Sequence, residues 1–80
     1  MYKRQLRDRF DALSSREREI MIQVTIGRLN KQIAHDIGIA ESTVKVHRTN
    51  LMRKMKARSL PELSRMADIL KLTPEEPQRS

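Results

Sequence analysis

The sequence predicts an all-α domain, and three observations carry that prediction. The 80 residues include two Gly, three Pro, one Tyr, one Phe and no Trp, whereas a sheet protein would favour β-branched and aromatic runs. Apolar residues recur at helical spacing in four separate segments. Two of these segments begin with the Ser-x-x-Glu signature of a helix start. We therefore expect one small four-helix domain, with helices over about 15–26, 31–37, 41–55 and 60–71.

Two further segments flank this domain, which we place over residues 12–72. Residues 1–11 carry apolar residues at steps of four among many charges, which predicts either a linker helix or a flexible linker. A helix of so few turns is marginal alone in water, so any order would come from Phe10 packing on the domain. Residues 73–80 are polar and interrupted by proline, and we expect them to form a disordered tail.

Capping boxes define the starts of the first and last expected helices. Ser14 and Glu17 form the first box, and Ser59 and Glu62 form the second. The inward side chains of the first helix are Leu13, Ile20, Met21 and Val24. Those of the last helix are Leu60, Leu63, Met66, Ala67 and Leu70. Ile26 falls off the first stripe, so we expect it to be partly exposed.

The two central helices are the most informative part of the chain. The helix over 31–37, which Asn30 can cap, stops at Gly38, where the backbone takes a left-handed conformation that a Cβ would disfavour. The helix over 41–55 follows after a tight turn. Residues 41–58 hold six basic residues and one acidic residue, which is +5 of the total formal charge of +7. Two short helices joined by a Gly turn, the second one basic, predict a helix-turn-helix with its second helix in the major groove of DNA.

An advance of about 100° per residue from Val44 divides the helix over 41–55 into two faces. The face toward the core holds Val44, His47, Leu51 and Met55. The opposite face holds Ser42, Lys45, Val46, Thr49 and Arg53. We interpret His47 as a buried, hydrogen-bonded structural residue and not as a catalytic or pH-sensing one.

Composition and spacing also narrow the function classes. The chain has no Cys, which excludes disulfides and thiolate metal sites and favours a reducing cytoplasm. His35 has no partner at metal-ligand spacing, and Glu17 and Glu19 face different sides of one helix. We therefore expect no metal, no cofactor and no enzymatic activity. No apolar run approaches the ~20 residues of a membrane span, so we expect no membrane partner.

Three spaced blocks of sequence resemble a known family. They are Leu-Ser-Ser-Arg-Glu-Arg-Glu-Ile over 13–20, Asn-Lys-Gln-Ile-Ala over 30–34 and Thr-Val-Lys-x-His over 43–47. In this order they resemble the LuxR/FixJ/NarL-type helix-turn-helix, over roughly residues 11–70. The continuation over 46–67 resembles the FixJ branch in particular.

The resemblance implies a sequence-specific, double-stranded DNA-binding output domain of a bacterial two-component transcriptional regulator, in the cytoplasm at the nucleoid. It also implies a homodimer on an inverted repeat. In this family a receiver domain usually precedes the output domain, and these 80 residues resemble the output domain alone. A receiver domain and RNA polymerase are therefore further expected partners in the full-length protein. Ala40 stands where relatives often have a capping Ser, and Thr49 where some have a base-reading Lys. We expect a weaker helix start and a changed sequence preference.

The phase of the helices assigns candidate contacts. Base-contact candidates are Lys45, Val46 and Thr49. Phosphate-contact candidates are Asn30, Lys31, Ser42, Thr43, Arg48, Arg53, Lys54 and Lys56. Dimer-face candidates are Arg65, Met66 and Ile69. The open alternatives are a phosphate contact for Lys45 or Thr49 and a place at the core edge for Val46. Local capping is the alternative for Asn30, Ser42 and Thr43, and ordinary surface is the alternative for the dimer face. Solvated surface charge is the alternative for Arg48, Arg53, Lys54 and Lys56.

Two other functions stay open at this point. Region 4 of a sigma factor has a similar opening and Thr-Val-Lys block, but it usually has Arg and Leu at the positions of Val46 and His47 and lacks a capped fourth helix. A helical protein-interaction module would leave the +5 charge of residues 41–58 unexplained.

Overall fold

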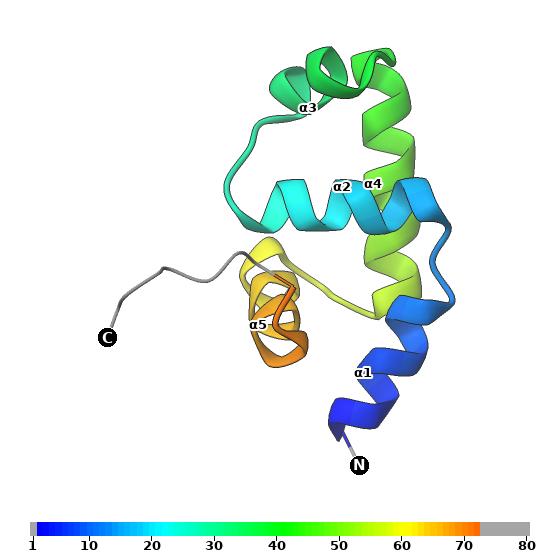
Figure 1. Ribbon diagram of the computed structural model, residues 1–80, viewed down its shortest axis with the longest axis vertical. Helices are drawn as coiled ribbons and strands as arrows, with labels where there is room; N and C mark the ends of the chain where they lie inside the picture. Colours follow the sequence, from blue (N-terminus) through cyan, green and yellow to red (C-terminus); the bar gives the residue numbers. More distant parts are fainter. Residues whose placement is uncertain (1, 73–80) are drawn as a thin grey trace.

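The computed structural model describes residues 2–72, and this part of the chain consists of helices and turns (Figure 1). The helices are α1 (Tyr2–Asp11), α2 (Ser15–Thr25), α3 (Asn30–Ile37), α4 (Glu41–Met55) and α5 (Leu60–Leu70). The predicted all-α class is therefore confirmed, and α2 to α5 begin and end within one residue of the expected positions. The expected disordered tail over 73–80 lies outside the described residues.

The segment before the expected domain is the helix α1, and it packs on the domain. Leu6 and Phe10 are buried, and α1 packs against α4 and α5. The Arg9 guanidinium group donates a hydrogen bond of 3.2 Å to the carbonyl oxygen of Met55, at the C-terminal end of α4. The Arg18 guanidinium carbon lies 5.9 Å from the centre of the Phe10 ring, within cation–π range. Of the two predicted forms of this segment, the helical one is observed.

The first capping box is complete and the second is not. Ser14 Oγ accepts a hydrogen bond of 3.1 Å from the Glu17 N–H, and Glu17 Oε1 accepts one of 2.9 Å from the Ser14 N–H. At α5, Ser59 Oγ accepts a hydrogen bond from the Glu62 N–H at 3.3 Å. Glu62 Oε1, however, accepts from the N–H of Arg58, one residue before the cap, at 2.8 Å. The expectation of a reciprocal box at α5 is therefore wrong in its second half.

Helix α3 begins differently from the expectation and ends as expected. Asn30 is the first residue of α3 and not its cap. The preceding Leu29 N–H donates to Gln32 Oε1 at 2.9 Å, which satisfies one of the free donors of the helix start. Gly38 has φ +74°, and its N–H donates to the Ala34 carbonyl at 2.9 Å, so the predicted left-handed stop is confirmed.

Helix α4 is the longest helix and packs against α1, α2 and α3 (Figure 1). The core contains the predicted inward residues of α2 and α5, of which only Leu60 is half-buried. The buried apolar side chains are Leu6, Phe10, Leu13, Ile20, Met21, Val24, Ile33, Ala34, Val44, Leu51, Met55, Leu63, Met66, Ala67 and Leu70. None of the helices within residues 2–72 is long and apolar enough to span a membrane.

Candidate nucleic-acid interface

The two faces expected for α4 are present, with one difference. Val44, Leu51 and Met55 are fully buried against the neighbouring helices. His47 is only half-buried and makes no side-chain hydrogen bond within residues 2–72, so its interpretation as a buried, hydrogen-bonded residue is wrong. The phase places His47 about 60° from Val44, at the edge of the stripe, where a large side chain reaches solvent.

The opposite face of α4 is open to solvent. Its side chains are exposed at all of the positions expected there, namely Ser42, Lys45, Val46, Thr49 and Arg53. Val46 is 58% exposed, so its apolar side chain lies on the open face of α4 and not at the core. The alternative that places Val46 at the edge of the core is therefore excluded.

The N-terminus of α4 has no side-chain cap. Ala40 occupies the cap position and accepts backbone hydrogen bonds from the N–H groups of Thr43 and Val44, at 3.0 and 3.1 Å. The hydroxyl groups of Ser42 and Thr43 are exposed and make no hydrogen bond to other described residues. The free N–H groups and hydroxyls at this end are thus available to an anion.

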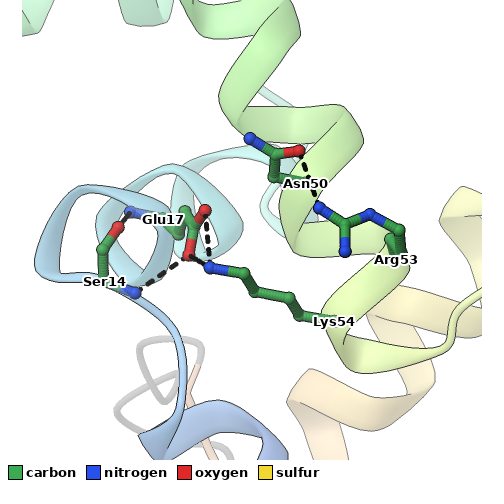
Figure 2. A network of polar contacts seen from close by, with 5 residues as sticks. All are labelled: Ser14, Glu17, Asn50, Arg53 and Lys54. Carbon is green, nitrogen blue, oxygen red and sulfur yellow. Dashed lines mark hydrogen bonds and ion pairs between the residues drawn. The ribbon is translucent and has the colours of Figure 1, made fainter.

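Lys54 is bound to another part of the protein. Its ammonium nitrogen lies 3.0 and 3.2 Å from the two carboxylate oxygens of Glu17, which is 4% exposed (Figure 2). Burial acts to raise the pKa of Glu17, but the hydrogen bonds from Ser14 and Lys54 and the charge of Lys54 outweigh it and lower the pKa. Lys54 is therefore paired with a buried carboxylate and is not an unpaired surface charge, and its phosphate contact stays a prediction.

Sequence reasoning identified Glu17 as a cap but missed this second contact. The two residues are 37 positions apart, and no local pattern joins them. The available signal was that Glu17 lies on the same side of α2 as Ile20 and Met21, both of which are buried.

Arg53, in contrast to Lys54, has no acidic partner within residues 2–72. Its Nη2 donates to Asn50 Oδ1 at 3.1 Å, on the exposed surface of α4 (Figure 2). Asn50 is a neutral amide, so the guanidinium group is oriented without being neutralised. Lys56 is also exposed and occupies the left-handed C-cap position of α4, with φ +60°.

Arg48 connects α4 to α3. Its Nη1 donates to Asn30 Oδ1 at 3.0 Å, and the pair is partly buried. These two residues line a pocket of about 370 Å³ together with Lys45, Thr49 and Met52, which we call the α3–α4 pocket. Lys31 lies next to Asn30 on the exposed surface of α3.

The dimer-face candidates on α5 separate into two groups. Met66 is 2% exposed and belongs to the core, so its assignment to a dimer face is wrong: it lies on the inward stripe of α5. Arg65 is exposed, and Ile69 is half-buried at the edge of the core.

The acidic and histidine side chains of residues 2–72 form no group of three that could hold a metal ion. His35 Nδ1 lies 3.7 Å from Asp36 Oδ1, and the histidine side chain is almost fully exposed. Asp36 is also paired with Arg28 at the surface.

Comparisons with known proteins agree on one family. The model of the bacterial regulatory proteins of the luxR family (GerE) matches residues 11–67. Transcriptional regulatory protein FixJ of Rhizobium meliloti (strain 1021) is 53% identical over 62 residues, covering 78% of this chain and 30% of the relative. Nodulation protein W of Bradyrhizobium diazoefficiens is 48% identical over 65 residues, covering 81% of this chain and 29% of the relative.

A solved structure agrees with the sequence relatives. Full-length FixJ from B. japonicum superimposes with a TM-score of 0.80 at 38% identity, covering 88% of this chain and 34% of that one. The chain therefore spans about a third of the length of the proteins that it matches.

Proposed function

Since this chain belongs to the luxR family of bacterial regulatory proteins, we propose that it is a sequence-specific DNA-binding domain whose helix α4 enters the major groove. Its role is that of the output domain of a two-component transcriptional regulator. Relatives of this chain include a transcriptional regulatory protein and a response regulator protein, TodT of Pseudomonas putida, which is 46% identical over 67 residues. DNA binding of this kind implies a cytoplasmic location at the bacterial nucleoid.

The observation that carries the proposal is the division of α4 into a buried and an exposed face. Val44, Leu51 and Met55 attach the helix to the domain along its whole length. The opposite face is free over the same length and carries Lys45 and Arg53. A helix that is fixed along one face and basic along the other fits a groove about as wide as a helix and lined by phosphates.

We assign base recognition to the exposed residues nearest the N-terminus of α4. Lys45 donates to the O6 and N7 acceptors of guanine, and Val46 packs on a thymine methyl group. Thr49, one turn further on, donates to a base edge or to a phosphate. The 58% exposure of Val46 supports its role, because binding would cover this apolar surface.

Backbone contacts come from both ends of α4 and from α3. The uncapped start of α4 binds a phosphate through its free N–H groups and the hydroxyls of Ser42 and Thr43. Arg53 and Lys56 contact phosphates near the other end, and Lys31 contacts one from α3. Lys54 stays a further candidate for such a contact, although it is paired with Glu17.

Two copies bind an inverted repeat through α5. Arg65 is exposed on this helix and Ile69 is half-buried beside it, which leaves a small mixed surface. A surface of this size is too small for a stable dimer in free solution, so pairing occurs on DNA. In the full-length protein a receiver domain and RNA polymerase are further partners.

A titration tests the proposal directly. The chain is titrated with a random duplex at two salt concentrations, and the affinity should fall steeply as salt rises, because phosphate contacts release counterions. Arg53→Gln should reduce the slope of log K against log salt by about 1. Arg4→Gln, an equal change of charge at an exposed position of α1, should leave the slope nearly unchanged. Weak binding without a salt slope would overturn the proposal.

Selection of bound duplexes from a random pool gives the half-site. An enriched inverted repeat would support both sequence specificity and pairing, whereas an unenriched pool would contradict the base-contact assignment. Ile69→Glu should then weaken binding to the full repeat and leave binding to a single half-site unchanged.

A further inference from the structure

The α3–α4 pocket lies at one edge of the exposed face of α4. With Val44 as the centre of the buried stripe, Arg48 lies about 40° from it and Thr49 about 140°, on the same side. The pocket therefore joins the buried side of α4 to its exposed side, next to the first turn of α3. A DNA backbone at the edge of a groove occupied by α4 would therefore pass over this pocket.

The opposite edge of α4 differs in charge. There, about 80° from Val44 in the other direction, lies Lys54, which is neutralised by Glu17. At the α3 edge, the one side-chain hydrogen bond of Arg48 within residues 2–72 goes to the amide oxygen of Asn30, at 3.0 Å. The guanidinium group is held in place by this bond and forms no ion pair within residues 2–72, although Glu41 lines a neighbouring pocket together with Arg48 and Asn30.

Arg48 retains donors for a ligand. A guanidinium group has more N–H donors than the one that Asn30 accepts, and they are arranged in a rigid fork suited to phosphate. The partly buried bond to Asn30 restricts the side chain before any ligand arrives, which reduces the entropy lost on binding. Thr49 adds a hydroxyl donor, and Met52 adds apolar surface of the kind that packs on a sugar.

We infer that the α3–α4 pocket binds one backbone phosphate of DNA through Arg48, with Asn30 as the residue that positions the guanidinium group. The inference rests on the proposed DNA binding and adds to it a defined anion site. It also assigns Asn30 an indirect role, since its oxygen is occupied by Arg48 and its effect on DNA is exerted through that residue.

Asn30→Asp provides the first test. An aspartate at this position would form an ion pair with Arg48 and neutralise it, as Glu17 neutralises Lys54. We expect binding to weaken roughly tenfold and the salt slope to fall by about 1. Gln5→Glu is the matched control, because it makes the same formal change at an exposed position of α1. This helix lies at the C-terminal end of α4 (Figure 1), so the change should alter affinity less than about twofold.

Asn30→Ala separates positioning from charge. It releases Arg48 without neutralising it, so affinity should fall roughly threefold while the salt slope stays unchanged. If Asn30→Asp behaves like Gln5→Glu, the pocket does not bind a phosphate. If wild-type binding has no salt slope at all, the proposed function has failed, and that result is distinct from failure of the pocket.

A change in the DNA gives a test that needs no variant at Asn30. Single phosphates of the selected duplex are replaced in turn by neutral methylphosphonates. One linkage should weaken wild-type binding but leave binding of Arg48→Gln unchanged, because that variant has already lost the charge. Equal losses for both proteins at every linkage would overturn the inference.

Discussion

The buried carboxylate of Glu17 is bound at once by the start of its own helix and by Lys54, whose ammonium nitrogen lies 3.0 and 3.2 Å from its two oxygens. One side chain therefore completes the capping box of α2 and attaches α2 to α4. Because α4 is the helix proposed to enter the groove, this contact helps to fix its direction relative to the rest of the domain.

The first prediction concerns this pair. Glu17→Gln should lower the free energy of unfolding at pH 7 by about 1–2 kcal/mol, because a charged hydrogen bond is lost while Lys54 is partly solvated. The pKa of Glu17 is lowered in the folded protein, so its contribution is present above the ordinary value of 4.5 and is lost as the pH falls through the folded pKa. Denaturant unfolding from pH 7 to pH 3 measures this effect.

The difference in stability between wild type and Glu17→Gln should therefore shrink as the pH falls below about 4.5. Glu19→Gln is the control, since Glu19 is exposed and its one ion pair within residues 2–72 is with Arg16 on the same helix. If the free energies of unfolding of wild type and Glu17→Gln differ by the same amount at every pH, the pKa of Glu17 is not lowered in the folded protein.

The second prediction distinguishes base contacts from phosphate contacts on α4. Lys45→Ala should cost about 1–3 kcal/mol on the selected site and relax the preference at one base position. Arg53→Ala should weaken all duplexes about equally. Affinities for the selected site and for single-base variants measure both effects, and identical behaviour of the two proteins would mean that the phase assigned to α4 is wrong.

The third prediction uses the uncapped start of α4. Thr and Val have nearly the same shape, but only Thr supplies an oxygen to the free N–H groups of the first turn. Ala40 is exposed, so both side chains fit. Ala40→Thr should be more stable to unfolding than Ala40→Val by about 1 kcal/mol. Equal thermal stability of the two variants would show that the first turn is already satisfied.

The fourth prediction tests whether α1 is part of the fold. Leu6 is fully buried, so Leu6→Ala should lower the free energy of unfolding by about 2–4 kcal/mol. Tyr2 is 51% exposed on the same helix, and Tyr2→Ala should change stability by less than about 0.5 kcal/mol. A Leu6→Ala protein as stable as Tyr2→Ala would mean that α1 is a loose extension of the domain in solution.

Local signals in the sequence were enough to locate the helices. The Ser14 box, the stop at Gly38 and the start at Ser59 involve neighbours only a few positions apart, so the information is contained in short segments. The inward stripe of α4 could also be predicted, because a periodic pattern determines which residues share a face.

Contacts between distant segments could not be predicted in the same way. Lys54 and Arg48 looked alike in the sequence, and only the fold shows that one meets the acid Glu17 and the other the amide Asn30. Met66 was assigned both an inward face and a surface role, and burial decides for the first. Asn30 was expected to cap α3, but a long-range bond to Arg48 uses its oxygen.

The buried and exposed stripes of α4 have no residue in common, and this separation has a consequence for how such a domain diversifies. Substitutions at Lys45, Val46 or Thr49 remove no core contact, so under the proposed base contacts a lineage could change its target sequence without losing the scaffold. Val44, Leu51 and Met55 are constrained by packing and accept few replacements. If the proposed base contacts hold, duplicated copies of this chain can acquire different operators at little risk to folding.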